Sequence, residues 1–193
     1  MAMDNITELE RYADKYFYDA AHCRQVLKLS ELLFDCLSGL HKLNKTHLLS
    51  LQQAAVLHDT GLSNGAVRHH KSSEAIIVDD PPPSISSDTL IRVACIARYH
   101  RKALPSPSHK MFARLSSAER YVVEKLAAII RIADGLDYFH DSTVESLHCD
   151  VKKDRVIIYL KAHSDCSEGI KQAYKKSDLF TQVFGKSLEI IAK

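Results

Sequence analysis

Apolar residues recur every three or four positions through most of the first 141 residues, a spacing that predicts an α-helical body. The first helical pattern runs from residue 4 to about residue 40, with charged side chains between its apolar positions. One of its apolar stripes contains His22, Val26, Leu29 and Leu33, so His22 is expected to face inward.

Further helical patterns follow over residues 47–59, 71–79, 89–100 and 118–140. N-cap residues are expected at Thr46, at Ser87 or Asp88, and at Ser116 or Ser117. Two of these apolar stripes end in His58 and His100, and a third contains Asp134. A carboxylate on a buried face is costly unless it is paired or binds a metal. The connections between the helices are rich in Gly, Pro and Ser and are expected to be loops.

The pattern changes after residue 141. Residues 142–151 and 155–163 alternate as strands do, with a turn at 152–154. A helical stretch over 166–185 and a last strand over 186–193 complete a ββαβ unit. We therefore predict a mainly α fold with two parts, a helical domain over residues 1–141 and a small α+β subdomain over residues 142–193 packed on it.

Composition narrows the class of protein. The 193 residues are 46% hydrophobic with a net charge of +2, which excludes a disordered, collagenous or membrane-spanning chain and does not indicate nucleic-acid binding. There is no phosphate-binding glycine loop and no signal-peptide pattern, and the five widely spaced cysteines are interpreted as reduced thiols. We expect a cytoplasmic protein.

The inward residues His22, His58, Asp59 and Asp134 offer two imidazoles and two carboxylates. This mixed donor set suits a divalent metal, with Mn²⁺ or Mg²⁺ expected first and Co²⁺, Zn²⁺, Ni²⁺ or Fe²⁺ as alternatives. Each residue alone also has an ordinary structural interpretation. A histidine on an apolar face is often a hydrogen-bonded core residue, and Asp134 has Arg131 as a nearby partner.

The segments AAVLHDTGL, HHKSSEAII, IARYHRKALP, LAAIIRIADGLD and KSDLFTQVFGKSLEI carry a resemblance that spans roughly residues 50–190. They resemble the HD superfamily of metal-dependent phosphohydrolases, and more closely the C-terminal HD module of the exopolyphosphatase and guanosine pentaphosphate phosphatase family. The resemblance implies a helical HD core with the metal ligands His22, His58, Asp59 and Asp134. Ser72 stands where the motif often has a second histidine, which favours one metal ion, with His69, His70 and His100 as nearby candidates for further ligands.

The same resemblance has a limit. In that family, hydrolysis of polyphosphate or pentaphosphate belongs to actin-like N-terminal domains with Gly-rich phosphate loops, which this sequence does not contain. Exopolyphosphatase activity is therefore not carried over, and the module is expected to act on its own site or to serve as a free-standing binding module.

For an enzyme, a metal-activated water would attack phosphorus, and His70 or His100 would protonate the leaving group. Asp137 is either an acceptor for a ligating histidine or a helix C-cap. Cations beside these histidines are candidates for holding phosphate oxygens, although cations at a helix C-terminus are also common on solvated surfaces: Arg68, Lys71, Arg98, Arg101 and Lys102.

Two functions follow as hypotheses. The first is a metal-dependent phosphohydrolase that acts on a nucleotide or another phosphorylated small molecule. The alternative is a non-catalytic module that binds polyphosphate or (p)ppGpp-type ligands or mediates dimerisation. The partner is thus a phosphorylated small molecule or polyphosphate, with no nucleic acid or membrane expected and a homodimer left open.

Overall fold

The computed structural model describes the backbone of residues 2–192 and the side chains of residues 5–192. Within that part of the chain, none of the helices combines the length and apolar character needed to cross a membrane. The elements in chain order are α1 (Ala2–Ala13), α2 (Ala20–Cys36), α3 (Ser38–His41), α4 (Lys45–Leu57), the 3₁₀ helix η1 (Thr60–Asn64), α5 (His69–Asp79), α6 (Ser87–Arg98), α7 (Lys110–Ala113), α8 (Ser117–Leu136), β1 (Val144–Val151), β2 (Arg155–Ala162), α9 (Ser167–Lys175), α10 (Asp178–Phe184) and β3 (Ser187–Ala192).

The N-terminal helical pattern is not one helix. The expectation of continuous helix over residues 4–40 was wrong, because the chain turns after α1 and restarts at α2. Asp19 causes the restart: its side chain accepts a hydrogen bond from the backbone N of His22 at 3.2 Å and caps the new helix. His22 therefore lies in the first turn of α2, next to the residue that caps this helix.

Other helix starts differ from expectation by one or two residues. Asn44, rather than Thr46, caps α4, since its side chain accepts from the backbone N of Thr46 and of His47. The N-cap of α6 is Ser86, one residue before the expected position. Ser116 caps α8 as expected and accepts from the backbone N of Glu119.

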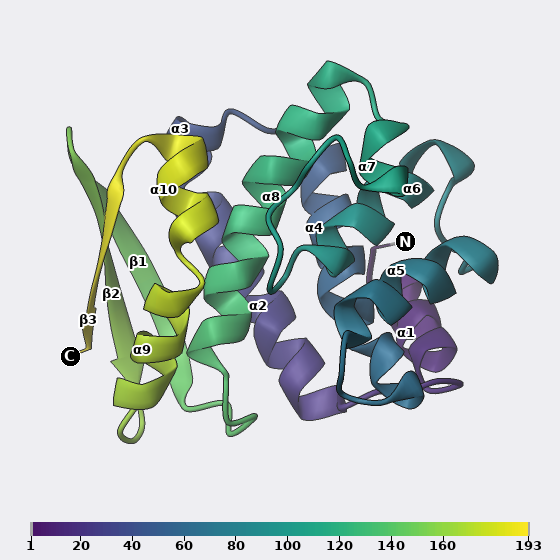
Figure 1. The fold of residues 1–193 in the computed structure, drawn as a ribbon. Helices are drawn as coiled ribbons and strands as arrows, with labels where there is room; N and C mark the ends of the chain where they lie inside the picture. The colour runs from purple at the N-terminus through teal and green to yellow at the C-terminus, as the bar shows by residue number, and fades with distance from the viewer. Residues whose placement is uncertain (1, 193) are drawn as a thin grey trace.

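The helix α8 is the centre of the molecule. Almost all of it from Val122 to Leu136 is buried, with α2, α4 and α6 packed around it (Figure 1). The same figure shows α5, α1 and α7 lying farther out on the side away from the sheet. Since α2, α4, α5, α6 and α8 all reach this core, residues far apart in sequence can meet at the ends of these helices.

The C-terminal part contains the expected small three-stranded sheet, but the single helical stretch expected over residues 166–185 is divided into the two helices α9 and α10. β1 pairs antiparallel with β2 and β2 pairs parallel with β3, with Cys149 opposite Ile158 and Ile158 opposite Ile190. The mainly α class with a small β appendage is thereby confirmed. The domain boundary at 141/142 stays a prediction.

Helix α9 packs very closely on the end of α8. A Cβ added at Gly135 would lie 2.6 Å from the Cα of Ala173, so only glycine permits this approach. Gly169 meets the carbonyl of Leu136 equally closely. This packing brings the C-terminal end of α9 over the end of α8, next to Asp134.

Two of the five cysteines are joined. Cys36 at the end of α2 and Cys149 in β1 form a disulfide with their Cα atoms 5.6 Å apart. The expectation of five reduced thiols was wrong for this pair, because a separation of 113 residues gives no local signal of proximity. The remaining cysteines, Cys23, Cys95 and Cys166, are free and buried. Since disulfides are rare in reducing compartments, the cytoplasmic location stays a prediction.

Candidate metal centre

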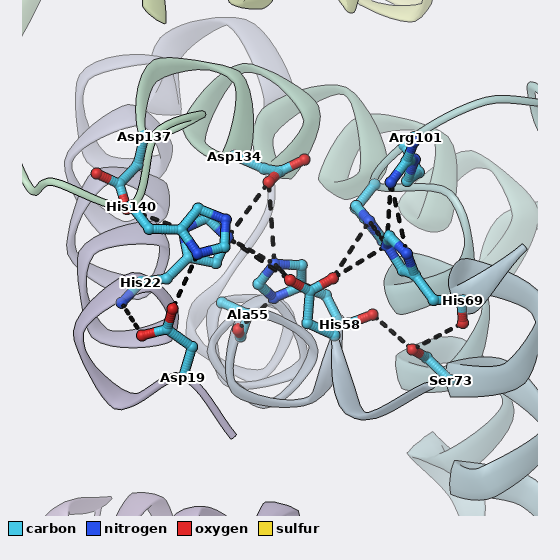
Figure 2. A network of polar contacts seen from close by, with 12 residues as sticks. Asp19, His22, Ala55, His58, His69, Ser73, Arg101, Asp134, Asp137 and His140 are labelled. Atoms are coloured by element: carbon cyan, nitrogen blue, oxygen red, sulfur yellow. Dashed lines mark hydrogen bonds and ion pairs between the residues drawn. The ribbon is translucent and has the colours of Figure 1, made fainter. Parts of the chain in front are cut away.

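The four residues predicted as metal ligands meet in one buried cluster. The Nε2 atom of His22 lies 3.2 Å from Nε2 of His58, 3.5 Å from Oδ1 of Asp134 and 3.8 Å from Oδ2 of Asp59. Figure 2 shows His22, His58 and Asp134 pointing toward one another from three different helical segments. The ligand atoms of His22, His58 and Asp134 are therefore close enough together to hold a metal ion.

The adjacent pair His58 and Asp59 converges because the helix ends there. α4 stops at Leu57, and Asp59 leaves the helical conformation with φ −105° and ψ 2° before η1 begins. Gly61 then lets η1 touch α5, since a Cβ at this position would clash with the backbone of His69 and Ser73. The hydroxyl of Ser73 donates to the carbonyl of His58 at 2.6 Å and holds this turn.

The hydrogen bonds at the Nδ1 atoms determine where the protons of these rings lie. Nδ1 of His22 contacts Oδ2 of Asp137 at 2.8 Å, and Nδ1 of His58 contacts the carbonyl of Ala55 at 2.8 Å. Both partners only accept, so each Nδ1 carries a proton. In their neutral forms both Nε2 atoms therefore present lone pairs to each other and to two carboxylates, an arrangement that needs a cation or an extra proton at its centre.

The pKa directions agree with this need. Although burial lowers it, the pKa of His22 is raised to about 10 by Asp134 and Asp137. Burial instead holds the pKa of His58 below its ordinary value, despite the nearby charge of Asp59. Without a metal, one proton on His22 thus partly takes the place of a divalent cation.

A second group of donors lies on the other side of Asp59. Its Oδ1 is 3.1 Å from Nε2 of His69 and 3.7 Å from Nε2 of His100, and the two nitrogens are 3.2 Å apart. Nδ1 of His100 contacts the carbonyl of Ala97 at 2.6 Å and Nδ1 of His69 that of Ala66 at 3.2 Å, so the Nε2 atoms again offer lone pairs. Asp59 therefore directs one carboxylate oxygen to each group.

This second group does not need a histidine at position 72. His69, one turn earlier in α5, supplies the imidazole, and Ser72 lies behind it against η1. The single-metal site expected from Ser72 stays a prediction, but the described residues offer these two adjacent donor groups and a third combination, His22, Asp59 and His140, that overlaps the first.

The two predicted proton donors have different positions. His100 lies within the second donor group, and burial lowers its pKa well below the ordinary value, so the ring is neutral near pH 7. His70 does not line the cavity described below; its ring centre is 6.3 Å from that of His69. Burial and the charges of His69 and Arg101 lower the pKa of His70 to about 4.

Asp137 has both of the roles considered from sequence. It is the C-cap residue of α8, and its Oδ1 accepts from the backbone N of Ser142 at 2.8 Å. Its Oδ2 accepts the His22 proton and so orients that ring. His140, to which the sequence assigned no role, stacks on His22 with ring centres 3.6 Å apart, and its Nδ1 lies 2.9 Å from Oδ2 of Asp19.

Asp134 pairs with Lys176 rather than with Arg131. Burial would raise the pKa of Asp134, but the Lys176 ammonium and the His22 ring hold it well below the ordinary value. Arg131 instead donates to the carbonyls of Lys176 and Tyr99 and to Asp178. The sequence did not reveal Lys176, because Lys175 and Lys176 lie within the helical stretch expected over residues 166–185, where lysines are usual on a solvated face.

A cavity of about 540 Å³ opens onto the cluster. Of the predicted phosphate-binding cations, Arg101 and Lys102 line it, and Arg101 lies 3.3 Å from Nε2 of His69. Arg98 pairs with Glu74 away from the cavity, and Arg68 and Lys71 are exposed outside it. The cavity is lined by Asp59, Leu62, Ala66, His69, His100, Arg101, Lys102, Arg131, Asp134, Tyr138, His140, Gln172, Lys175, Lys176 and Asp178.

A comparison with known protein families identifies the family of the chain. The family model described as Ppx/GppA phosphatase, domain III, matches residues 6–179, which include both donor groups and Lys176. No curated protein matches the sequence.

Proposed function

Because the chain belongs to the Ppx/GppA phosphatase, domain III, family, we propose that it is an HD-type metal-dependent phosphohydrolase acting on a phosphorylated small molecule. The observation that carries the proposal is the convergence of four histidine Nε2 atoms and two buried carboxylates beneath a cavity lined by cations. Phosphatase-related activity is consistent with the family. Dependence on a metal is our inference from the donor atoms.

The donors fit divalent metal ions. His22, His58 and Asp134 would hold one ion, Asp59 would bridge, and His69 with His100 would complete a second position. Four imidazoles favour a first-row transition-metal ion over Mg²⁺, which prefers oxygen ligands, and the two carboxylates also allow Mn²⁺. Such an ion lowers the pKa of a coordinated water and polarises a phosphoryl oxygen.

The protein's own groups would bind and orient the substrate. Arg101 lies beside the second donor group and Lys176 beside Asp134, so each can reach phosphate oxygens held at the cluster. Arg131 fixes the backbone on both sides of the cavity, since it donates to the carbonyls of Lys102 and Lys176. These cations would neutralise charge on the transferred phosphoryl group.

The proton for the leaving group would come from His140, a residue that the sequence did not indicate. His70 lies outside the cavity, and both nitrogens of His100 are engaged by Ala97 and the cluster. His140 lines the cavity with a side chain that is 39% exposed, and so it is the better-placed donor for a leaving group.

A second function, binding without turnover, is favoured by one contact. The Lys176 ammonium neutralises Asp134 without any metal, which would let the cluster persist as an ion-pair network. In that case the cations of the cavity would bind polyphosphate or a (p)ppGpp-type ligand. Turnover distinguishes the two functions.

Phosphate release from a panel of phosphorylated compounds in the presence of Mn²⁺ tests the proposal. The wild-type chain is expected to release phosphate and the Asp59→Ala variant to lose at least 100-fold in rate, because Asp59 serves both donor groups. Asp79→Ala, an exposed carboxylate outside the cavity, is the matched control. Undiminished turnover in Asp59→Ala would overturn the mechanism.

The role of the cations is tested separately. Arg101→Met is expected to raise KM about tenfold, since a charge-assisted hydrogen bond to phosphate is lost. Arg114→Met removes an exposed arginine that does not line the cavity. Equal KM values for the two variants would contradict phosphate binding by Arg101.

A further inference from the structure

We propose that Tyr138 forms a base-stacking subsite of this cavity, so that the ligand is a nucleotide rather than an inorganic phosphate chain. This inference rests on the proposed function, because it names the substrate class of the same site. Three features carry it: a half-exposed aromatic residue that lines the cavity, a loop anchored to the donor cluster on both sides of this residue, and a cation-rich remainder of the cavity.

Tyr138 is 47% exposed although it lines the cavity. An exposed aromatic side chain loses no packing when it accepts another ring, and every nucleobase offers a π face for stacking. Phe139 contacts the Tyr138 ring edge to face with centres 5.3 Å apart, which supports its position from the side. Phe139 itself does not line the main cavity.

The loop that carries Tyr138 is fixed on both sides. Asp137, directly before it, accepts from Nδ1 of His22 at 2.8 Å and from the backbone N of Ser142 at 2.8 Å. His140, two residues after it, stacks on His22 and pairs with Asp19. The aromatic wall is therefore tied to the donor cluster, and such preorganisation lowers the entropy cost of binding.

The rest of the lining suits the other half of a nucleotide. Arg101 and Lys102 come from the segment after α6, and Lys175 and Lys176 from the end of α9. These four cations line the same cavity as Asp59 and Asp134, where a phosphoryl group would bind. The cavity volume of about 540 Å³ lies within the range of small-molecule sites. An inorganic phosphate chain would use the cations and leave Tyr138 without a role.

The experiment compares nucleoside triphosphates with inorganic tripolyphosphate in the presence of Mn²⁺. Binding to the full chain is measured by calorimetry and turnover by phosphate release, for the wild type and for Tyr138→Ala. We expect Tyr138→Ala to weaken nucleotide binding about tenfold and to change tripolyphosphate binding less than twofold. Tyr138→Phe keeps the ring and is expected to restore nucleotide binding. Tyr121→Ala, an exposed tyrosine on α8 outside the cavity, is the matched control.

The outcomes separate this inference from the proposed function. Turnover of both ligands with no nucleotide-specific loss in Tyr138→Ala would overturn the subsite and leave the hydrolase intact. Tight nucleotide binding that depends on Tyr138, without turnover, would support the subsite and overturn the hydrolase. An equal loss for both ligands would show that Tyr138 only shapes the cavity and would contradict the inference. Failure of the wild type to bind any nucleotide would also contradict it.

Discussion

The Nε2 atoms of His22 and His58 lie 3.2 Å apart, although the Nδ1 hydrogen bonds of both rings leave these nitrogens as acceptors. Two lone pairs at hydrogen-bond distance repel each other unless a cation or a proton lies between them. Asp59 and Asp134 add negative charge at the same point. The cluster of His22, His58, Asp59 and Asp134 therefore needs a metal cation or a proton between these atoms.

The orientation of His22 depends on Asp137. Asp137 accepts hydrogen bonds from Nδ1 of His22 and from the backbone N of Ser142. The amide in Asp137→Asn has only one oxygen that accepts, so its NH₂ group would face one of these two N–H groups and that hydrogen bond would be lost. We expect the Mn²⁺ affinity to fall about 10- to 100-fold. Calorimetric titration with Mn²⁺ measures the loss, and thermal unfolding verifies that the variant folds. An unchanged affinity would show that Asp137 serves only as a helix cap.

The second donor group predicts a second metal position. His100→Ala removes one nitrogen near Oδ1 of Asp59 and leaves His22, His58 and Asp134 in place. We expect the number of Mn²⁺ ions bound per chain to fall from about two to about one. Elemental analysis after equilibrium dialysis counts them, with His148→Ala on β1 as a control. One ion per chain in both the wild type and His100→Ala would support the single-metal site expected from the sequence.

The sequence was sufficient to locate the first donor group. His22, His58, Asp59 and Asp134 each fall on or at the end of an apolar stripe, and that position already indicates a buried meeting point. His69 and His100 were candidates for further ligands together with His70, and the sequence did not distinguish among the three. The meeting of His69 and His100 depends on the packing of α5 against α6, and their approach to Asp59 depends on the contact of η1 with α5; no periodicity encodes either contact.

The remaining cavity residues could not be predicted in the same way. Lys176 and Tyr138 reach the site only because α9 packs on α8 at Gly135 and because the chain turns sharply after Asp137. Both are long-range consequences of packing. The break between α1 and α2 was missed for a different reason, since the apolar spacing continues across it although α1 ends at Ala13 and Asp19 starts a new helix.

The contact of η1 with α5 at Gly61 provides a test of how the fold positions the site. In Gly61→Ala the new methyl group would clash with the backbone of His69 and Ser73. We expect a loss of about 1–3 kcal/mol in the free energy of unfolding and weaker Mn²⁺ binding, because Asp59 and His69 would move apart. Gly39→Ala is the matched control, since nothing lies within 4 Å of its added Cβ. Equal stability of the two variants in urea unfolding would contradict the packing.

A pH-dependent prediction concerns an ion pair far from the cluster. The side-chain hydrogen bond from Arg92 holds the pKa of Glu119 below its ordinary value of 4.5. The stabilisation is therefore present above pH 4.5 and is lost as the pH falls through the lower folded-state pKa. Glu119→Gln is expected to cost up to about 1 kcal/mol at pH 7 and nothing in strong acid.

Glu124 provides the control of opposite sign. Burial raises its pKa above 4.5, so ionisation destabilises the fold as the pH rises. Glu124→Gln is expected to stabilise the protein slightly at pH 7 and to leave it unchanged in acid. Melting temperatures of both variants and the wild type between pH 3 and 7 measure the difference. The same sign for both substitutions would refute the assigned environments.

The most direct test of the account is the metal content of the purified chain, determined by elemental analysis and by calorimetric titration of the metal-stripped protein with Mn²⁺. We predict at least one and up to about two metal ions per wild-type chain and their loss in Asp59→Ala, because Asp59 contacts both donor groups. A metal-free wild type that gives no binding heat with Mn²⁺ or Zn²⁺ would contradict the account. The protonated His22 ring and the Lys176 ammonium, which pairs with Asp134, would then be the cations that hold the cluster together.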